Sequence, residues 1–214
     1  MKIKICGLKR EEDIEYVNVC KPDYIGFVFA GQKRKIDYDT AKHLKSKLDS
    51  SIRAVGVFVN ENIEFIDRLV CDNIIDMIQL HGDEDENYIS RLKEHLSVKG
   101  NQDIPIIKAV RVRSKEQVLE SESLPVDYLL LDAFSEKDYG GVGVTFNHEL
   151  IPELCKPYML AGGIDFENVT KIIKNISLKN VSVPVCVDVS SSVETDGYKD
   201  YKKIEEMVDI VQRL

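Results

Sequence analysis

The stretch MKIKICGL at residues 1–8 sets the pattern from which the fold can be predicted. An apolar, β-branched segment ends in Cys6 and Gly7, and helical periodicity begins at Arg10 after a very short turn. This order of strand, turn and helix is one βα unit. If the unit repeats along the chain, the strands form a parallel sheet with helical crossovers.

Eight segments of the chain, the first one included, have the composition of a strand. They are residues 3–7, 24–29, 54–59, 77–82, 105–112, 128–134, 158–164 and 183–190. Helical periodicity is found between and after them, over 10–19, 38–48, 63–71, 86–96, 115–120, 167–176 and 201–214. The sixth connection, through FNHELIPELCK, has the weakest helical pattern.

Eight βα units predict an α/β fold, the (β/α)8 or TIM barrel. The competing architecture is an open doubly wound sheet, which usually carries GxGxxG after its first strand, and Gly7 stands alone there. No linker rich in Pro, Ser or Gly interrupts the series. We therefore expect residues 1–214 to form a single barrel domain.

Composition argues against several classes of protein. Of the 214 residues, 43% are apolar and 31% are charged, as in soluble globular proteins. No apolar run approaches the roughly 20 residues that span a bilayer. The net charge of -8 argues against non-specific nucleic-acid binding, which depends on clustered Lys and Arg. A small anionic substrate is still compatible with this charge, because a few local cations can dominate a pocket.

Cysteine and histidine usage argues against disulfides and metals. The five cysteines are odd in number and lack CxxC spacing, which fits neither a disulfide framework nor a zinc ribbon. A reducing cytoplasm fits this usage best. The four histidines show neither HxH nor HxxxH spacing, so we expect no metal site.

In a (β/α)8 barrel, chemistry gathers at the C-terminal ends of the strands. Lys4 and Cys6 share one face of the first strand, so Cys6 can point into the barrel mouth, although a buried cysteine is often only a small apolar residue. Asp132 closes a strand of leucines, where a carboxylate is costly to bury without a purpose or a partner. The alternative is that Asp132 only caps a helix or forms a salt bridge. Asp188, in VCVDVS, has either a direct role or hydrogen bonds to neighbouring loops.

The last three βα loops are rich in small residues, in the motifs YGGVG, LAGGI and DVSSSVE. Small residues let backbone N–H groups approach an anion, and the usual phosphate site of this fold follows strands seven and eight. We therefore expect a phosphorylated small molecule to bind there, although glycine also serves tight turns. The candidate residues are Gly141, Gly162, Gly163, Ser191 and Ser192.

Two polar loops follow strands two and four. In AGQKRKID, Arg34 lies between Lys33 and Lys35, and an arginine there can clamp a substrate carboxylate with its planar fork. These residues alone do not choose among the three cations. His81, in QLHGDE, is more typical of a structural hydrogen bond than of a catalyst.

Taken in order, the motifs of the chain resemble the phosphoribosylanthranilate isomerase family. They are KICGL at 4–8, GFVF at 26–29, VGVFV at 55–59, QLHGDE at 79–84, LLLD at 129–132, GGVG at 140–143, LAGGI at 160–164, VDVSSSVE at 187–194 and GYKD at 197–200. The resemblance covers the whole chain, and the first, the fourth and the last two motifs are together very specific.

The resemblance implies a (β/α)8 barrel that converts N-(5-phosphoribosyl)anthranilate to 1-(2-carboxyphenylamino)-1-deoxyribulose 5-phosphate in tryptophan biosynthesis, without a cofactor. It also implies that Cys6 is the general base, Asp132 the general acid and Arg34 the ligand of the substrate carboxylate. We expect desolvation to favour the protonated form of Asp132, and nearby cations or helix N-termini to lower the pKa of Cys6. Monomers and dimers both occur with this architecture, so the chain is expected to be a monomer or a homodimer.

The chain departs from the family pattern at several positions. Gln32 and Lys33 replace the usual Ser-Pro before the arginine, which predicts a less rigid loop in which Lys33 or Lys35 can share the carboxylate. The other departures lie in or near the phosphate loops and affect the expected phosphate contacts more than the activity. They are Val142, Asn147, His148 and Ser192.

The sequence alone does not exclude two other functions. Another phosphosugar-binding barrel isomerase would share mainly the phosphate loops, and a histidine-pathway isomerase is expected to carry aspartate in place of Cys6. A non-catalytic barrel subunit would bind the ligand without turnover. The presence of both Cys6 and Asp132 argues against it.

Overall fold

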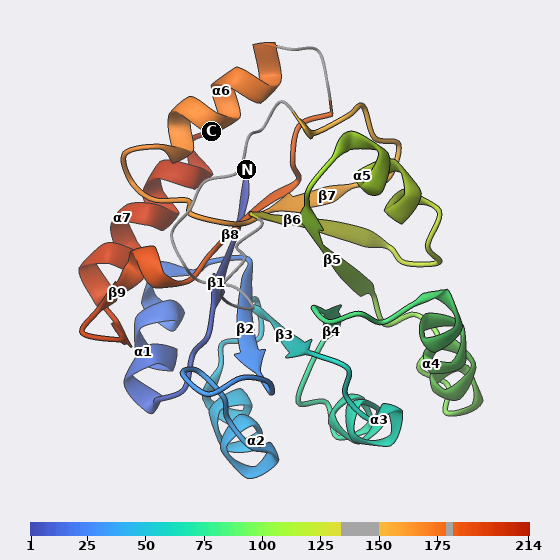
Figure 1. Cartoon of the computed structure of the whole chain (residues 1–214). Coiled ribbons are helices and arrows are strands. Elements are labelled where there is room, and N and C mark those ends of the chain that lie inside the picture. The colour runs from blue at the N-terminus through green and yellow to red at the C-terminus, as the bar shows by residue number, and fades with distance from the viewer. Residues whose placement is uncertain (134–149, 179–181) are drawn as a thin grey trace.

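Figure 1 shows the computed structural model of the chain, which describes residues 1–133, 150–178 and 182–214. Eight parallel strands close into a barrel, in which each strand pairs with the next in the sequence and β8 pairs with β1. The strands are β1 Lys2–Cys6, β2 Tyr24–Val28, β3 Arg53–Phe58, β4 Met77–Leu80, β5 Ile106–Val112, β6 Tyr128–Ala133, β7 Tyr158–Leu160 and β8 Cys186–Val189. The predicted (β/α)8 barrel is confirmed.

The helices form an outer layer around the strands (Figure 1). They are α1 Glu11–Cys20, α2 Tyr38–Lys47, α3 Ile63–Cys71, α4 Glu86–Val98, α5 Lys115–Glu122, α6 Val169–Leu178 and α7 Tyr201–Gln212. Side-chain caps mark several helix starts: Asp37, Asp85 and Ser114 each accept a hydrogen bond from the backbone N–H three residues later. Such caps satisfy N–H groups that have no partner inside the helix. None of the described helices is both long enough and apolar enough to cross a bilayer.

Alternation of side chains along the strands separates two cores. Ile3 and Ile5 are fully buried in the larger core, between the strands and the helices. Lys4 and Cys6 alternate with them and face the barrel interior. The inner core is filled by Tyr24, Val55, Met77, Ile107, Ala109, Leu130, Met159, Ala161 and Cys186. Cys6 and Asp132 share the inward face of β1 and β6 at the C-terminal ends of these strands.

Several predicted boundaries were wrong. The seventh strand ends at Leu160 and not at residue 164, because Gly162 and Gly163 adopt positive φ angles of 87° and 62° that a strand does not accept. The eighth strand begins at Cys186, where its pairing with β1 and β7 starts, and Val183 and Val185 before it are exposed. Most of the predicted sixth connection, up to residue 149, lies outside the described residues, and the described residues 151–157 contain no helix.

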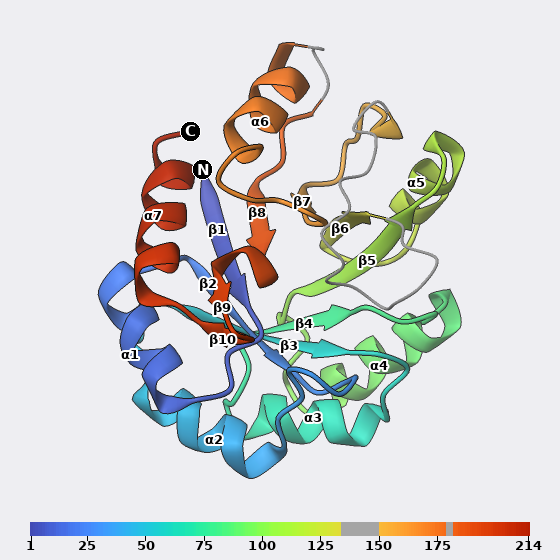
Figure 2. The same cartoon turned by 60° about the vertical axis from the view of Figure 1, so that its left-hand side comes forward.

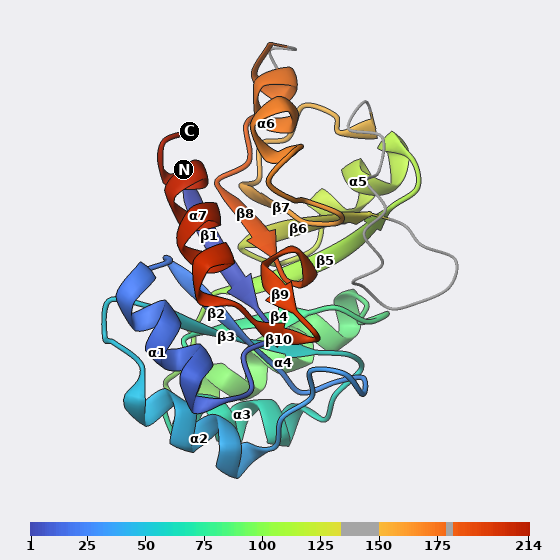
Figure 3. The same cartoon turned by 90° about the vertical axis from the view of Figure 1, so that its left-hand side faces the viewer.

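The connection after β8 has structure that the sequence patterns did not predict. A short 3-10 helix, Ser191–Val193, leads into an antiparallel ribbon of β9 Glu194–Thr195 and β10 Tyr198–Lys199. Figures 2 and 3 show this ribbon near the C-terminal end of β1, next to the start of α7, while the two chain termini lie close together at the other end of β1. The ribbon therefore lies at the rim of the barrel mouth.

Candidate active site

Cys6 ends β1, and its sulfur lies against Gly26 of the neighbouring strand. A Cβ atom at Gly26 would lie 2.7 Å from Cys6 Sγ and 3.1 Å from Cys6 Cα. The chain beyond Cys6 is held to the same glycine, because Gly7 and Leu8 donate backbone hydrogen bonds to the Gly26 carbonyl at 2.9 and 3.2 Å. The absence of a side chain at Gly26 therefore creates the space that the sulfur occupies.

Replacing Gly26 with alanine is expected to lower kcat/KM by about 10- to 100-fold, because the new methyl displaces the Cys6 sulfur and small misplacements of reacting groups are that damaging. The control is Gly56→Ala, whose Cβ would meet the Phe58 ring at 2.8 Å and not the sulfur. Both variants overpack a strand and are expected to lose about 1–3 kcal/mol of stability. Equal catalytic losses in the two variants would mean that the fold, and not the position of the sulfur, is responsible.

Lys4 lies one inward position before Cys6 and is completely buried. Its Nζ donates to both carboxylate oxygens of Asp188, at 3.1 and 3.0 Å. Burial lowers the pKa of Lys4, but the Asp188 carboxylate and an ionised Cys6 sulfur outweigh it, so the pKa lies above its ordinary value. A fixed cation therefore stands next to Cys6. Asp188 serves as its counter-ion, and the expected contact of Asp188 with substrate stays a prediction.

Burial raises the pKa of the Cys6 thiol above its ordinary value. The ammonium groups of Lys4 and Lys199 oppose this effect only in part. Both cations act in the expected direction, but the expected net lowering of the Cys6 pKa was wrong, because desolvation of the sulfur dominates.

This pKa predicts how the rate depends on pH. If the Cys6 thiolate is the base, kcat/KM of Asp132→Asn, which has no titrating acid at position 132, is expected to rise about tenfold per pH unit below the raised pKa of Cys6. The measurement is kcat/KM of this variant from pH 7 to 9, with the double variant that also carries Cys6→Ala as the reference without the thiolate. A flat profile in Asp132→Asn over this range would contradict the assignment of the base.

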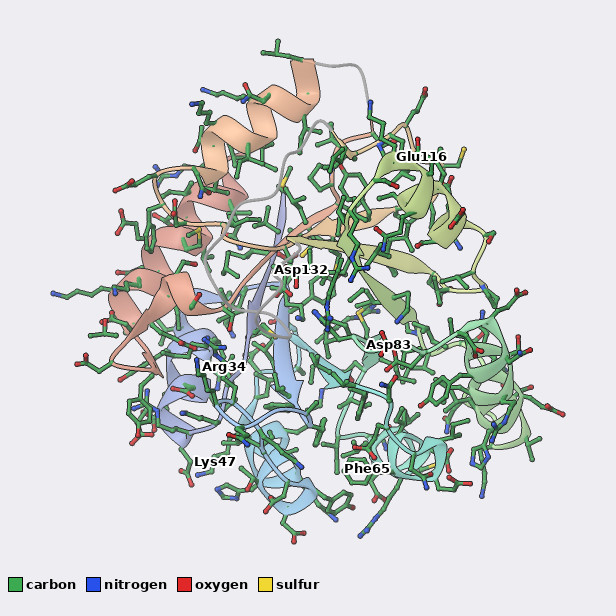
Figure 4. The ribbon with its side chains drawn as sticks, viewed as in Figure 1. Arg34, Lys47, Phe65, Asp83, Glu116 and Asp132 are labelled. Carbon is green, nitrogen blue, oxygen red and sulfur yellow. The ribbon has the colours of Figure 1, made fainter. Side chains whose placement is uncertain are left out.

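Asp132 lies on the inward face of β6 and is only 7% exposed. His81 Nε2 lies 3.3 Å from Asp132 Oδ2, and Gln79 Nε2 lies 2.9 Å from His81 Nδ1. Because Gln79 Nε2 can only donate, His81 Nδ1 accepts this bond, and the Nε2–H of His81 faces the carboxylate. Figure 4 places Asp132 near the middle of the ring of strands. His81, predicted to be a structural loop residue, thus contacts the candidate acid directly.

Arg34 is half-buried, whereas Lys33 and Lys35 beside it are exposed. Its Nε and Nη2 donate to the two carboxylate oxygens of Glu194, each at 2.8 Å. Figure 4 shows Arg34 on the side of the barrel where β1 and β2 lie. Of the three cations of this loop, Arg34 is the one fixed toward the barrel mouth. The hydrogen bonds to Glu194 raise the pKa of Arg34, and an ionised Cys6 sulfur raises it further.

The candidate phosphate loops follow the adjacent strands β7 and β8. The backbone N–H groups of Gly162 and Gly163 donate to no other described residue. Asn168 Nδ2 donates to the Gly163 carbonyl at 2.8 Å and holds the loop in place. Ser192, where the family has glycine, has a buried Oγ without a hydrogen-bond partner among the described residues. These features suit a loop that receives an anion.

Some predicted site residues lie outside the described part of the chain. They are Gly141, Val142, Asn147 and His148. Among the residues that the structure does describe, no group of three or more His, Cys, Asp or Glu is placed to hold a metal ion. All five cysteines are described and are free thiols.

Sequence reasoning missed four polar residues of the site, Lys4, Gln79, Glu194 and Lys199. A signal was present for each of them. Lys4 and Gln79 interrupt apolar strands at inward positions, and Glu194 and Lys199 belong to the motifs VDVSSSVE and GYKD. What the sequence lacked was the hydrogen-bond or ion-pair partner of each side chain.

Comparison with known proteins agrees with the family resemblance of the sequence motifs. The family described as N-(5'phosphoribosyl)anthranilate (PRA) isomerase matches residues 3–210. A relative from Endomicrobium trichonymphae, named N-(5'-phosphoribosyl)anthranilate isomerase, is 49% identical over 213 residues, which cover 100% of this chain and 99% of the relative.

Solved structures agree with this result. The phosphoribosyl anthranilate isomerase of Thermotoga maritima superimposes with a TM-score of 0.81 at 29% identity, covering 100% of both chains. A second structure, of such an isomerase in complex with reduced 1-(o-carboxyphenylamino)-1-deoxyribulose 5-phosphate, has a TM-score of 0.76 at 28% identity and also covers 100% of both chains.

Proposed function

The chain belongs to the N-(5'-phosphoribosyl)anthranilate isomerase family, and we propose that Cys6 and Asp132 carry out its reaction as general base and general acid. The reaction converts N-(5-phosphoribosyl)anthranilate to 1-(2-carboxyphenylamino)-1-deoxyribulose 5-phosphate in tryptophan biosynthesis. The observation that carries the proposal is the inward placement of both residues at the C-terminal ends of β1 and β6, where barrel enzymes hold their catalytic groups.

The first step opens the furanose ring. Asp132 gives a proton to the ring oxygen as the bond from that oxygen to C1 breaks, and the lone pair of the anthranilate nitrogen forms a double bond to C1. The resulting Schiff base is protonated on nitrogen and withdraws electrons from C2. Burial of Asp132 to 7% exposure keeps water away from this proton transfer.

The second step moves a proton away from C2. The Cys6 thiolate takes that proton, and the electron pair of the broken bond forms the double bond between C1 and C2 while the nitrogen becomes neutral. Tautomerisation of this enolamine gives the ketone. No electrons enter or leave, because the oxidation at C2 balances the reduction at C1. The Lys4 ammonium next to Cys6 stabilises the thiolate that performs the step.

Substrate binding is proposed to use both sides of the mouth. Arg34 binds the anthranilate carboxylate, since its planar fork matches two oxygens. The phosphate binds at the loops after β7 and β8, which include Gly162, Gly163, Ser191 and Ser192, with Gly141 proposed to contribute from the loop after β6. We further propose that the chain works in the cytoplasm as a monomer or homodimer.

Turnover by the purified protein tests the function. Phosphoribosylanthranilate is generated enzymatically, and its conversion is followed by the fluorescence of the anthranilate group. Rapid conversion to the aminodeoxyribulose phosphate is expected. If reduced product analogue binds tightly but no turnover occurs, the chain is a non-catalytic binding subunit. Absence of both would leave another phosphosugar as the substrate.

A further inference from the structure

Glu194 occupies one edge of the Arg34 guanidinium. The two hydrogen bonds run from Arg34 Nε and Nη2 to the two oxygens of Glu194 and are both 2.8 Å long. A guanidinium has five N–H donors in a rigid fork, so this contact leaves Nη1 and the second hydrogen of Nη2. These remaining donors form a second edge that can bind another carboxylate with two parallel bonds.

The arginine stem is fixed as well as its head. Gly7, with φ of 88°, lies directly against the stem, and a Cβ there would approach Arg34 Cδ to 2.4 Å. Gly7 follows Cys6 in the chain. The Arg34 side chain is therefore held between the turn after β1 and the ribbon after β8. Its outer edge has a defined direction relative to Cys6.

Glu194 is itself held by buried groups. Lys199 is 4% exposed, and its Nζ donates to Glu194 Oε1 at 2.7 Å and to the Ser190 carbonyl at 2.9 Å. Burial would raise the pKa of Glu194, but the Arg34 hydrogen bonds and the Lys199 charge outweigh it and lower the pKa to about 2. The carboxylate is thus ionised at any working pH.

The network also reaches the backbone of the candidate base. Ser190 Oγ donates to the Cys6 carbonyl at 2.9 Å, so the strand end that carries the sulfur and the ribbon that carries Glu194 are joined. One set of contacts therefore fixes the orientation of Arg34 and the end of β1 together.

We propose that Glu194 is a positioning residue that aims the outer edge of Arg34 at the anthranilate carboxylate and so determines selection of a carboxylated aromatic amine. The inference rests on the proposed role of Arg34. Glu194 touches no reacting atom. Glu194 restricts the Arg34 side chain before the substrate binds, so less side-chain entropy is lost on binding.

Two ligands test the inference. One is reduced 1-(2-carboxyphenylamino)-1-deoxyribulose 5-phosphate, and the other is the phenylamino compound that lacks only the carboxyl group. The readout is the ratio of their dissociation constants. Wild-type protein is expected to prefer the carboxylated ligand, and Glu194→Gln is expected to reduce this preference about tenfold or more, the usual scale for a charged hydrogen bond. Affinity for the phenylamino compound is expected to stay unchanged.

Glu84→Gln is the matched control, because it makes the same substitution in another buried ion pair, in which Lys108 Nζ donates to Glu84 at 2.8 Å, and leaves both Arg34–Glu194 hydrogen bonds. Its preference ratio is expected to match the wild type, whatever happens to its melting temperature. If Glu194→Gln does not fold, the double variant with Lys199→Met removes both buried partners and takes its place. It is expected to show the same reduced preference.

Two outcomes would overturn the inference: an unchanged ratio in the Glu194 variant, or an equal loss of affinity for both ligands. The second outcome would mean general structural support. Failure of the proposed function gives a different result. In that case wild-type protein does not isomerise phosphoribosylanthranilate, or it binds the two ligands equally before any substitution is made.

Discussion

Cys6→Ala is expected to lower kcat/KM for phosphoribosylanthranilate by about 10²- to 10⁴-fold, the usual contribution of a general acid or base. In the proposed mechanism the variant lacks the group that takes the proton from C2, while the proposed carboxylate and phosphate contacts remain. The dissociation constant of the reduced product analogue is therefore expected to change little. Single-turnover kinetics with the same fluorescence signal measure the loss in the chemical step.

Cys186→Ala is the control for the Cys6 variant. Cys186 also faces the barrel interior and is fully buried, but it begins β8 and so lies at the opposite end of the barrel. Each substitution removes one sulfur from inside the barrel. Cys186→Ala is expected to keep the wild-type rate, with a small loss of stability from the cavity. Full activity in the Cys6 variant would remove Cys6 from the mechanism.

The fold could be predicted because its signals are local. Each strand is a short run of β-branched and apolar residues, and each described helix carries its own periodicity, so eight units can be counted without knowing any contact. The errors lie where local signals are weak. LAGGI reads as a continued strand because its leading residues are apolar, but Gly162 and Gly163 turn the chain after Leu160.

The candidate site could be predicted only in part, because charge pairing is not local. The alternation of side chains along β1 predicted that Cys6 faces the barrel interior. In contrast, Lys4 pairs with Asp188 across 184 positions of sequence, and Arg34 pairs with Glu194 across 160. Any of several acidic residues could have been the partner, and closure of the barrel decides between them.

The pKa of Cys6 shows why chemistry is harder to predict than position. The presence of cations near the mouth was expected, and Lys4 and Lys199 are indeed close enough to favour the thiolate. Burial of the sulfur acts in the opposite direction and is the larger effect. The sign of the shift depends on distances and desolvation that only the folded structure supplies.

Asp132→Asn is expected to lower kcat for phosphoribosylanthranilate by about 10²- to 10⁴-fold, because an amide cannot protonate the ring oxygen. Asparagine has the shape of aspartate and can still hydrogen-bond to His81, which lies 3.3 Å from the carboxylate, so the mouth is expected to keep its structure. Asp132→Glu restores the acid on a longer stem and is expected to recover part of the rate. Steady-state kinetics of the three proteins measure these effects.

Ring opening provides a further readout for Asp132, because the reduced product analogue is already open and needs no acid. Its affinity for Asp132→Asn is therefore expected to stay close to the wild-type value while kcat falls. The control is Asp127→Asn, since Asp127 stands before the other end of β6 and accepts a hydrogen bond from the Ile106 backbone at 2.8 Å. A retained kcat in Asp132→Asn, or an equal loss in Asp127→Asn, would contradict the assignment of the acid. If analogue affinity falls as far as kcat does, Asp132 acts in binding and the proton for the ring oxygen comes from another group.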